Sequence, residues 1–204
     1  MSQVILIKYN TFDFMDQLLE QIRACDVCQN FLPFPPRPII QASVNSRVVI
    51  IGQAPGQKVN QCGIHWDDLS GNELRRWLGV EKEQFYNKEL FALIPMGFCY
   101  PGKSKSGDLP PRAECAPLWH QKLLSNMHEI RLTLLVGQYS QQCYLKEKYS
   151  GSITENVRNY QDFLPNFLPL VHPSPRNKIW HKKNPWFETD VLPKLQGIVA
   201  GVIG

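Results

Sequence analysis

The sequence lacks the features that would tie the protein to a membrane or an export route. No run of about 18 apolar residues occurs, so no membrane-spanning helix is expected. The N-terminus has neither the basic region nor the long apolar stretch and cleavage site of a signal peptide. Internal repeats, low-complexity tracts and linkers are also missing. These absences predict a cytoplasmic protein with one domain over residues 1–204.

Strong charge and a nucleotide-binding motif are missing as well. The formal net charge is only +4, a mildly basic balance that is compatible with a polyanionic partner but does not require one. The motif GxxxxGK[ST] does not occur, and the glycine-containing segment 52–56 is too short to wrap a triphosphate. A phosphate-binding hydrolase is therefore the weakest of the enzyme classes considered.

Short apolar runs that alternate with helical patterns predict the fold. Strands are expected at residues 48–51, 90–94, 131–136 and 167–171. Helices are expected from a cap at Thr11 to about Cys25, and at 71–78, 113–125, 138–148, 153–162 and 186–195, whereas the proline-rich segment 31–38 is expected to be an extended loop. This alternation predicts an α/β three-layer sandwich with a central, mostly parallel four-stranded sheet flanked by helices.

Two loops follow the first and the last predicted strand. Residues 52–56 read Gly-Gln-Ala-Pro-Gly and offer small side chains and backbone N–H groups. Residues 172–176 read His-Pro-Ser-Pro-Arg and offer a histidine stiffened by two prolines. Loops at the carboxyl ends of parallel strands converge on one crevice. We therefore expect a site there for an anionic ligand that is held closely and polarised.

Four of the six cysteines form a pattern. Cys25 and Cys28 make a CxxC pair, and Cys99 and Cys115 lie sixteen positions apart. Disulfides are not expected in a reducing compartment, but four thiolates from one close pair and two single sites hold either zinc or an iron–sulfur cluster. A chance CxxC with two buried cysteines is the alternative that spacing leaves open.

The two loops, taken with their surroundings, resemble a known family. Gly-Gln-Ala-Pro-Gly at 52–56, Gly-Ile-His-Trp at 63–66 and Ser-Gly at 70–71 resemble the first motif of the uracil-DNA glycosylase superfamily. His-Pro-Ser-Pro at 172–175 resembles its second motif, and the cysteine spacing is similar to that of the iron–sulfur branches called families four and five. The resemblance extends from about residue 25 to residue 176 and includes the order and spacing of all these segments.

The resemblance implies both an activity and a cofactor. It implies a monofunctional DNA glycosylase of base excision repair that hydrolyses the N-glycosidic bond of uracil or a related deaminated or damaged base. DNA is then the partner, and a monomer is expected. The resemblance further implies a [4Fe–4S] cluster on Cys25, Cys28, Cys99 and Cys115, with zinc as the alternative, and excludes Cys62 and Cys143 from the ligands.

The resemblance also assigns the expected chemistry to particular side chains. His172 is expected to donate a hydrogen bond to the base oxygen where negative charge collects. Asp68, in preference to Asp67, is expected to supply the carboxylate for the sugar cation, although a helix N-cap is the alternative. Trp66 is expected to stack on the flipped base, the alternative being a core residue.

Further contacts are expected along both loops and in the basic segment that follows. The base is expected to contact Gln53 and Ala54 in addition to Trp66. The residues expected to contact DNA are Pro55, Gly56, Ser174, Pro175, Arg176, Lys178, Lys182 and Lys183, with Lys103 and Lys105 as further candidates for phosphate contacts.

Two positions depart from the family pattern. Pro95 stands where family four has an asparagine that reads the uracil edge, and proline offers no side-chain or backbone donor. Ala54 stands where other uracil glycosylases have a water-activating aspartate. These departures leave the excised base open, and they make a non-catalytic nucleic-acid-binding module with the same fold the alternative function.

Overall fold

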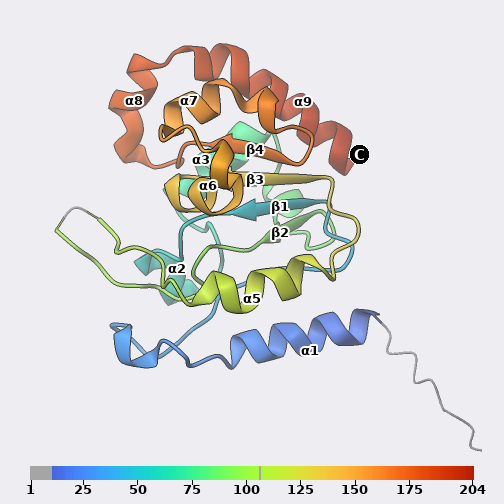
Figure 1. Cartoon of the computed structure of the whole chain (residues 1–204), viewed down its shortest axis with the longest axis vertical. Helices are drawn as coiled ribbons and strands as arrows, with labels where there is room; N and C mark the ends of the chain where they lie inside the picture. The colour runs from blue at the N-terminus through green and yellow to red at the C-terminus, as the bar shows by residue number, and fades with distance from the viewer. Residues whose placement is uncertain (1–10, 106) are drawn as a thin grey trace, which may run out of the picture.

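The central sheet explains how the two motif loops meet. The computed structural model describes residues 11–105 and 107–204. Four strands, β1 (Val48–Ile51), β2 (Phe91–Leu93), β3 (Leu132–Val136) and β4 (Phe167–Leu170), form one sheet in the order β2-β1-β3-β4 (Figure 1). Every pairing is parallel. The predicted three-layer α/β architecture is confirmed, and this sheet is wholly rather than mostly parallel.

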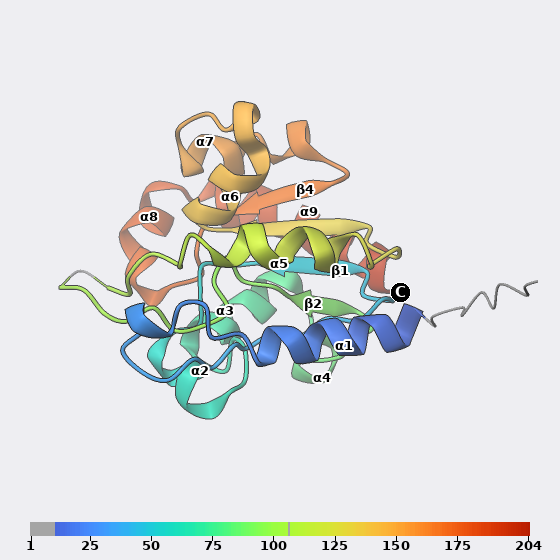
Figure 2. The same cartoon turned by 60° about the horizontal axis from the view of Figure 1, so that its bottom comes forward.

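Helices cover both faces of the sheet. The helical segments of the described residues are α1 (Thr11–Arg23), α2 (Gln57–Cys62), α3 (Leu69–Leu78), α4 (Lys82–Phe85), α5 (Cys115–Leu124), α6 (Gln138–Leu145), α7 (Ile153–Arg158), α8 (Lys178–Lys183) and α9 (Leu192–Ile203). Helices α1, α5 and α6 pack on one face, and α3 and α9 pack on the other. Figure 2 shows α1 and α5 in front of the sheet.

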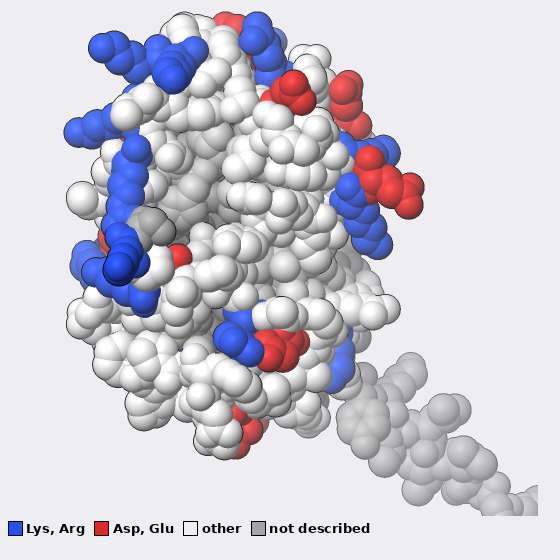
Figure 3. Space-filling view, turned by 60° about the vertical axis from the view of Figure 1, so that its left-hand side comes forward, with Lys and Arg blue, Asp and Glu red and all other residues white. Residues whose placement is uncertain are grey.

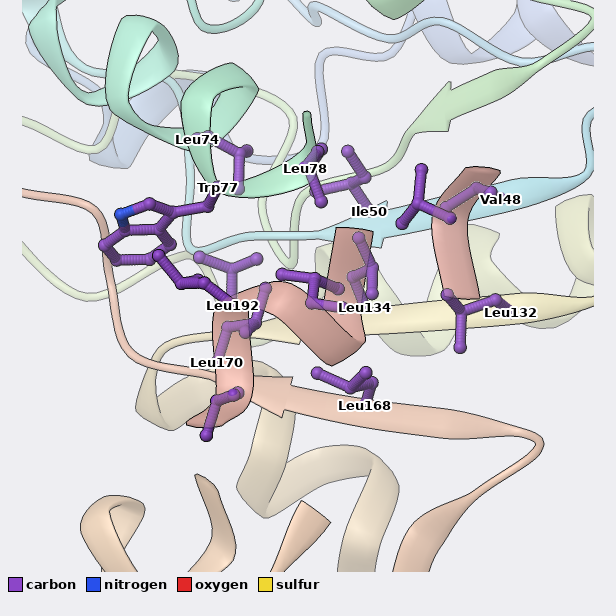
Figure 4. Packing of buried hydrophobic residues seen from close by; sticks show 14 of the residues in the cluster. Val48, Ile50, Leu74, Trp77, Leu78, Leu132, Leu134, Leu168, Leu170 and Leu192 are labelled. Carbon is purple, nitrogen blue, oxygen red and sulfur yellow. The ribbon is translucent and has the colours of Figure 1, made fainter. Parts of the chain in front are cut away.

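Alternating side chains of the strands supply two apolar cores. Val48 and Ile50 of β1 point toward α3 and α9, where Trp77 is completely buried (Figure 4). Val49 and Ile51 point the opposite way, toward α1 and α5. Because a strand presents successive side chains to opposite faces, four consecutive apolar residues are the pattern of a strand that is covered on both sides. The burial of this run therefore fixes the strand in the middle of the sandwich.

Several predicted helix bounds were wrong, each for a local reason. The helix predicted at 71–78 begins at Leu69, because Asp68 caps it. The one predicted at 138–148 ends at Leu145, because Lys146 takes a positive φ of 49° and a 3-10 turn (Lys146–Lys148) follows. The one predicted at 153–162 ends at Arg158 and is followed by the 3-10 turn Tyr160–Phe163.

The remaining differences lie at the chain ends and in short helices. The last helix was predicted at 186–195, whereas a π-helical turn (Phe187–Val191) leads into α9, which continues to Ile203. Helix α5 starts at Cys115 rather than 113, and Thr11 is the first residue of α1 rather than its cap, the preceding residue lying outside the described residues. Helices α2, α4 and α8 were missed, because four to six residues are too few to show a helical period.

The order of the strands creates a crevice at the carboxyl edge of the sheet. From β1 the chain moves outward to β2, and it then returns to form β3 and β4 on the other side of β1. The loops after β1 and β3 therefore leave in different directions, which opens the space where ligands of open α/β sheets bind. Along the described residues, no helix has the length and apolarity needed to cross a membrane.

Candidate active site at the carboxyl edge

One pocket of about 420 Å³ lies at this edge and gathers most of the predicted site residues. Its walls come from the loops after β1, β2 and β4, from the segment before α3, and from the loop that precedes α5. The predicted residues that line it are Gln53, Ala54, Pro55, Gly56, Trp66, Asp68, His172, Ser174 and Arg176. Pro175 lines an adjoining pocket beside Asp68, and Lys178, Lys182 and Lys183 lie exposed on α8, outside the pocket wall.

His172 follows β4, and hydrogen bonds from two later residues to its backbone carbonyl fix its position. Its carbonyl oxygen accepts hydrogen bonds from the Ser174 amide at 2.8 Å and from Asn177 Nδ2 at 2.6 Å. Neither ring nitrogen has a hydrogen-bond partner among the described residues, so the imidazole is available to a ligand in the pocket. Burial lowers the pKa of His172 below its ordinary value, although the charge of Asp68 acts in the opposite direction. The ring is therefore neutral at neutral pH and retains one N–H donor.

Asp68 serves as a helix cap and also lies in the pocket wall. Its Oδ1 atom accepts a hydrogen bond from the Gly71 amide at 2.8 Å, which satisfies one free donor at the start of α3. Its Oδ2 atom has no hydrogen-bond partner among the described residues. Asp67 instead lies 3.7 Å from Lys82 in an ion pair and lines only the adjoining pocket. This geometry favours Asp68 over Asp67 as the carboxylate that faces a ligand.

Trp66 is fixed in an unusual conformation by two glycines. Its φ of 55° lies in the left-handed region, which a bulky side chain seldom adopts. A Cβ on Gly52 would lie 2.9 Å from Cζ2 of the indole, and a Cβ on Gly71 would lie 1.6 Å from the Trp66 carbonyl oxygen. The indole is half-buried, and its ring centroid lies 5.7 Å from that of His172. The two rings therefore form a shared aromatic corner of the pocket.

Arg75 holds the backbone of Trp66 from behind, a role the sequence analysis did not assign. The side chain is buried and forms no ion pair with any carboxylate of the described residues. Its Nη1 atom donates to the Trp66 carbonyl at 3.3 Å, and its Nη2 atom donates to Asn72 Oδ1 at 2.6 Å. The guanidinium also lies over the rings of Phe85 and Tyr86, at 5.3 Å and 5.7 Å from their centroids, which offsets part of the cost of burying its charge. Its hydrogen bond to the Trp66 carbonyl helps to keep that residue in its left-handed conformation.

The loop before α5 supplies two wall residues that the sequence analysis missed, Gly107 and Asp108. Gln53 Nε2 donates to the Leu109 carbonyl at 3.0 Å, which ties the first motif loop to this segment. Because the Gln53 amide nitrogen carries two hydrogens, the amide retains one N–H donor as well as the Oε1 acceptor for a ligand. No motif marks Asp108, because it follows a run of small and basic residues.

Pro95 lines the pocket at the place where the family pattern has an asparagine. Its carbonyl oxygen is not free either, since the buried His120 lies with Nε2 at 3.0 Å from it. His120 Nδ1 lies 2.7 Å from the Tyr144 hydroxyl, so Nε2–H donates to Pro95 and Nδ1 accepts from Tyr144. The Pro95 side chain therefore has no group that could read a base edge, and one of the two lone pairs of its carbonyl oxygen is engaged by His120.

The four predicted ligand cysteines converge although they come from three separate parts of the chain. Cys25, Cys28, Cys99 and Cys115 line one small pocket together with apolar side chains such as Phe98 and Trp119. The Phe98 amide donates to Cys115 Sγ at 3.3 Å. All six cysteines are free thiols, and Cys62 and Cys143 are exposed and lie elsewhere.

Burial of these cysteines favours the protonated thiol over the thiolate. Burial raises the pKa of Cys99 to about 11 and that of Cys115 to about 12, and the neighbouring cysteines add to both shifts. The contribution of the neighbouring cysteines reflects repulsion between like charges, so four thiolates are stable together only with a cation between them. Among the described residues, no group of three or more His, Cys, Asp or Glu side chains is arranged to hold a single metal ion.

The charge distribution marks the same edge of the molecule. Figure 3 shows Lys and Arg side chains along one side of a hollow in the face that contains the carboxyl edge of the sheet. The cations of the second motif loop and of α8, Arg176, Lys178, Lys182 and Lys183, are exposed, and so are Lys103 and Lys105. A polyanion that entered the hollow would pass beside them.

The pocket therefore lies at the switch point of a parallel α/β sheet, between the loops that follow β1 and β4, which is the place where open α/β sheets bind their ligands. A sequence model of the uracil DNA glycosylase superfamily matches residues 40–196, and the chain therefore belongs to that superfamily. The fold is also similar to a solution NMR structure from Methanosarcina acetivorans, of a protein described as a "putative Uracil DNA glycosylase". That likeness has 14% sequence identity and a TM-score of 0.42, and it covers 77% of this chain and 93% of the other.

Proposed function

We propose that the protein is a monofunctional DNA glycosylase of base excision repair that removes uracil or a related deaminated base by hydrolysis. The observation that carries the proposal is that Trp66, Asp68 and His172 line one pocket, although the last lies about a hundred residues from the others in the chain. Superfamily membership gives the reaction class, and the pocket supplies groups for each of its steps.

The first requirement of the reaction is a flipped nucleotide held in the pocket. A base inside a duplex is out of reach, so glycosylases take it out of the stack and read it between aromatic and polar side chains. Trp66 provides the stacking surface, and Gln53 Oε1 provides an acceptor for a base N–H. Since the Pro95 side chain supplies no amide, we expect recognition to rest on the Gln53 amide, whose acceptor suits the N–H of uracil and also that of hypoxanthine or xanthine.

The second requirement is to stabilise charge as the N-glycosidic bond breaks. Negative charge collects on the departing base, and the neutral His172 ring donates a hydrogen bond to the base oxygen. Positive charge collects on the sugar, and the Asp68 carboxylate faces it with Oδ2 while Oδ1 stays fixed at the helix cap. Water that this carboxylate orients then attacks the sugar, so no lysine adduct forms.

Product analysis on a panel of oligonucleotides tests the proposal. Single strands and duplexes that contain uracil, hypoxanthine or xanthine are incubated with the protein, and abasic sites are detected by strand cleavage after alkali. We expect cleavage only after alkali for at least one base, and no covalent adduct with borohydride. Binding without an abasic product from any substrate would instead support the nucleic-acid-binding module.

We also propose that Cys25, Cys28, Cys99 and Cys115 hold a [4Fe–4S] cluster. The four thiols line one small, mostly apolar pocket, which supports a shared metal centre, and the cysteine spacing resembles that of the iron–sulfur branches of the superfamily. One zinc ion on the same four sulfurs is the alternative. When bound, the cluster supplies a structural link between the end of α1 and the two ends of the loop that carries Asp108 and Leu109. It takes no part in the hydrolysis.

The basic residues beside the pocket lead to a prediction on salt dependence. Replacing Arg176, Lys182 and Lys183 with alanine is expected to flatten the slope of log affinity against log salt concentration by about 2 for single-stranded DNA, since each lost phosphate contact removes about 0.7. Fluorescence anisotropy titrations between low and moderate salt measure the slope.

A matched triple variant controls for the loss of net charge. Lys88, Lys122 and Arg131 are exposed cations away from the carboxyl edge, so replacing them with alanine removes the same charge and is expected to leave the slope unchanged. If both triple variants give the wild-type slope, the DNA lies on another face of the molecule.

A further inference from the structure

A second pocket of about 460 Å³ lies directly beside the first. Gln53 and His172 line both pockets and form the partition between them. The other walls come from the end of β3, the starts of α6 and α7, and Trp180 of α8. Because β3 and β4 end here, this pocket also belongs to the carboxyl edge of the sheet. None of the proposed catalytic steps uses it.

The walls of the second pocket are aromatic. Tyr139, Tyr149 and Trp180 line it, and all three side chains are half-buried. The hydroxyl groups of the two tyrosines have no hydrogen-bond partner among the described residues, whereas the Trp180 indole N–H donates to Thr154 Oγ1 at 2.8 Å. The pocket therefore offers aromatic surface and two unused hydroxyls. A flat heteroaromatic ligand with polar edges matches this chemistry, and a nucleobase is such a ligand.

Charge outside the pocket indicates what would carry such a base there. Trp180 lies on α8, in the sequence between the exposed Lys178 and Lys182. Arg176, in the loop that leads into α8, lines the first pocket. A single nucleic-acid strand that follows these cations would pass the mouths of both pockets. Aromatic side chains next to a basic track are the usual means by which proteins hold unpaired strands.

We propose that the second pocket binds the nucleobase adjacent to the excised one, so that the substrate is single-stranded or locally unpaired DNA with two neighbouring bases unstacked. This inference rests on the proposed function, because it uses the first pocket as the site of excision. In a duplex, the neighbouring base is both stacked and paired, so the second pocket stays empty unless a second pair opens. Gln53 and His172 separate the two pockets, so that one base can enter each pocket.

Binding to uncleavable single strands tests the proposal without any need for turnover. One probe carries a tetrahydrofuran abasic residue flanked by normal nucleotides, and a second probe lacks the bases on both sides of that residue as well. Tyr149→Ala is expected to lower affinity for the first probe by about 10-fold, within the range for loss of one base stack, and to leave affinity for the second probe unchanged. Fluorescence anisotropy gives both affinities.

Three comparisons make the result decisive. Tyr149→Phe keeps the ring and is expected to keep most of the affinity, and Ile179→Ala removes an exposed side chain of α8 that lines neither pocket, with no expected effect. Tyr139→Ala provides an independent second variant, and circular dichroism shows that each variant is folded. An equal loss on both probes, or no loss on either, would overturn the proposal.

The outcome is separable from that of the proposed function. If wild type excises a base but Tyr149→Ala binds both probes like wild type, only the second pocket is wrongly assigned. If no base is excised and the dependence on the neighbouring base still appears, the binding pocket stands and the enzymatic function fails. Wild type is also expected to bind the first probe about 10-fold more tightly as a single strand than within a duplex, because the neighbouring base of a duplex must first be unpaired and unstacked.

Discussion

His172→Ala is expected to lower the single-turnover rate of base excision by about 100- to 1000-fold, the usual loss when one donor to a developing oxyanion is removed. The histidine ring has no other hydrogen-bond partner among the described residues, so its loss leaves no buried group of the protein unpaired. Affinity for the substrate is expected to change much less, because the hydrogen bond strengthens only as charge develops. Rapid-quench measurements with enzyme in excess over substrate give the rate directly.

The same experiment separates the two roles of Asp68. Asparagine caps helices as well as aspartate does, so Asp68→Asn is expected to keep the fold and still lose about 100-fold in rate. Asp68→Ala is expected to lose the rate and, in addition, about 1 kcal/mol of stability. Asp67→Asn is the control and is expected to keep the rate. A full rate for Asp68→Asn with a loss for Asp67→Asn would move the carboxylate role to Asp67.

Trp66 provides a contrast to these two side chains. Its indole stacks on the base before and during the reaction, so Trp66→Ala is expected to weaken substrate binding more than it slows the bond-breaking step. Equal and large losses in rate for Trp66→Ala and His172→Ala would show that the indole acts mainly by positioning His172, whose ring centroid lies 5.7 Å away.

The parts of the fold that were predictable from sequence are those fixed by short-range patterns. The run at Val48–Ile51 is apolar at every position, and the run at Leu132–Val136 is apolar except for Thr133. Such short apolar runs are typical of strands that are covered on both faces. The two motif loops were predictable because each directly follows such a strand, and parallel strands bring their carboxyl ends together. The resemblance indicated that the four cysteines belong together, and they do line one pocket; the choice among a cluster, zinc and plain burial stays a prediction.

The parts that were not predictable depend on contacts between distant segments. Arg75 lies in a helix next to Leu74, and only the packing of α3 behind Trp66 shows that it contacts the Trp66 carbonyl. Asp108 reaches the pocket because the loop before α5 folds back onto Gln53. Tyr139 and Tyr149 resemble ordinary half-buried residues until Trp180 completes their pocket. None of these contacts leaves a period or a motif in the sequence.

Protein purified without oxygen is expected to contain about four iron and four sulfide per chain, with the broad visible absorption of a [4Fe–4S] cluster. Cys99→Ala and Cys115→Ala are expected to lose the cluster and to lower the free energy of unfolding by about 3 kcal/mol or more, because metal binding that requires the folded site adds to folding stability. A loss of that size lowers the midpoint of thermal unfolding by roughly 6–12 °C in a chain of this length. Elemental analysis and thermal scans measure both effects.

Cys62→Ala and Cys143→Ala are the matched controls, because both thiols are exposed and lie away from the shared pocket. They are expected to keep the iron content and the unfolding midpoint of wild type. One zinc per chain, or no metal at all in wild type, would contradict the cluster. A cluster that survived in Cys99→Ala would exclude that thiol as a ligand. Loss of the cluster is expected to lower the rate of base excision only indirectly, through movement of the loop before α5. In this loop the Leu109 carbonyl accepts a hydrogen bond from Gln53, and Asp108 forms part of the pocket wall.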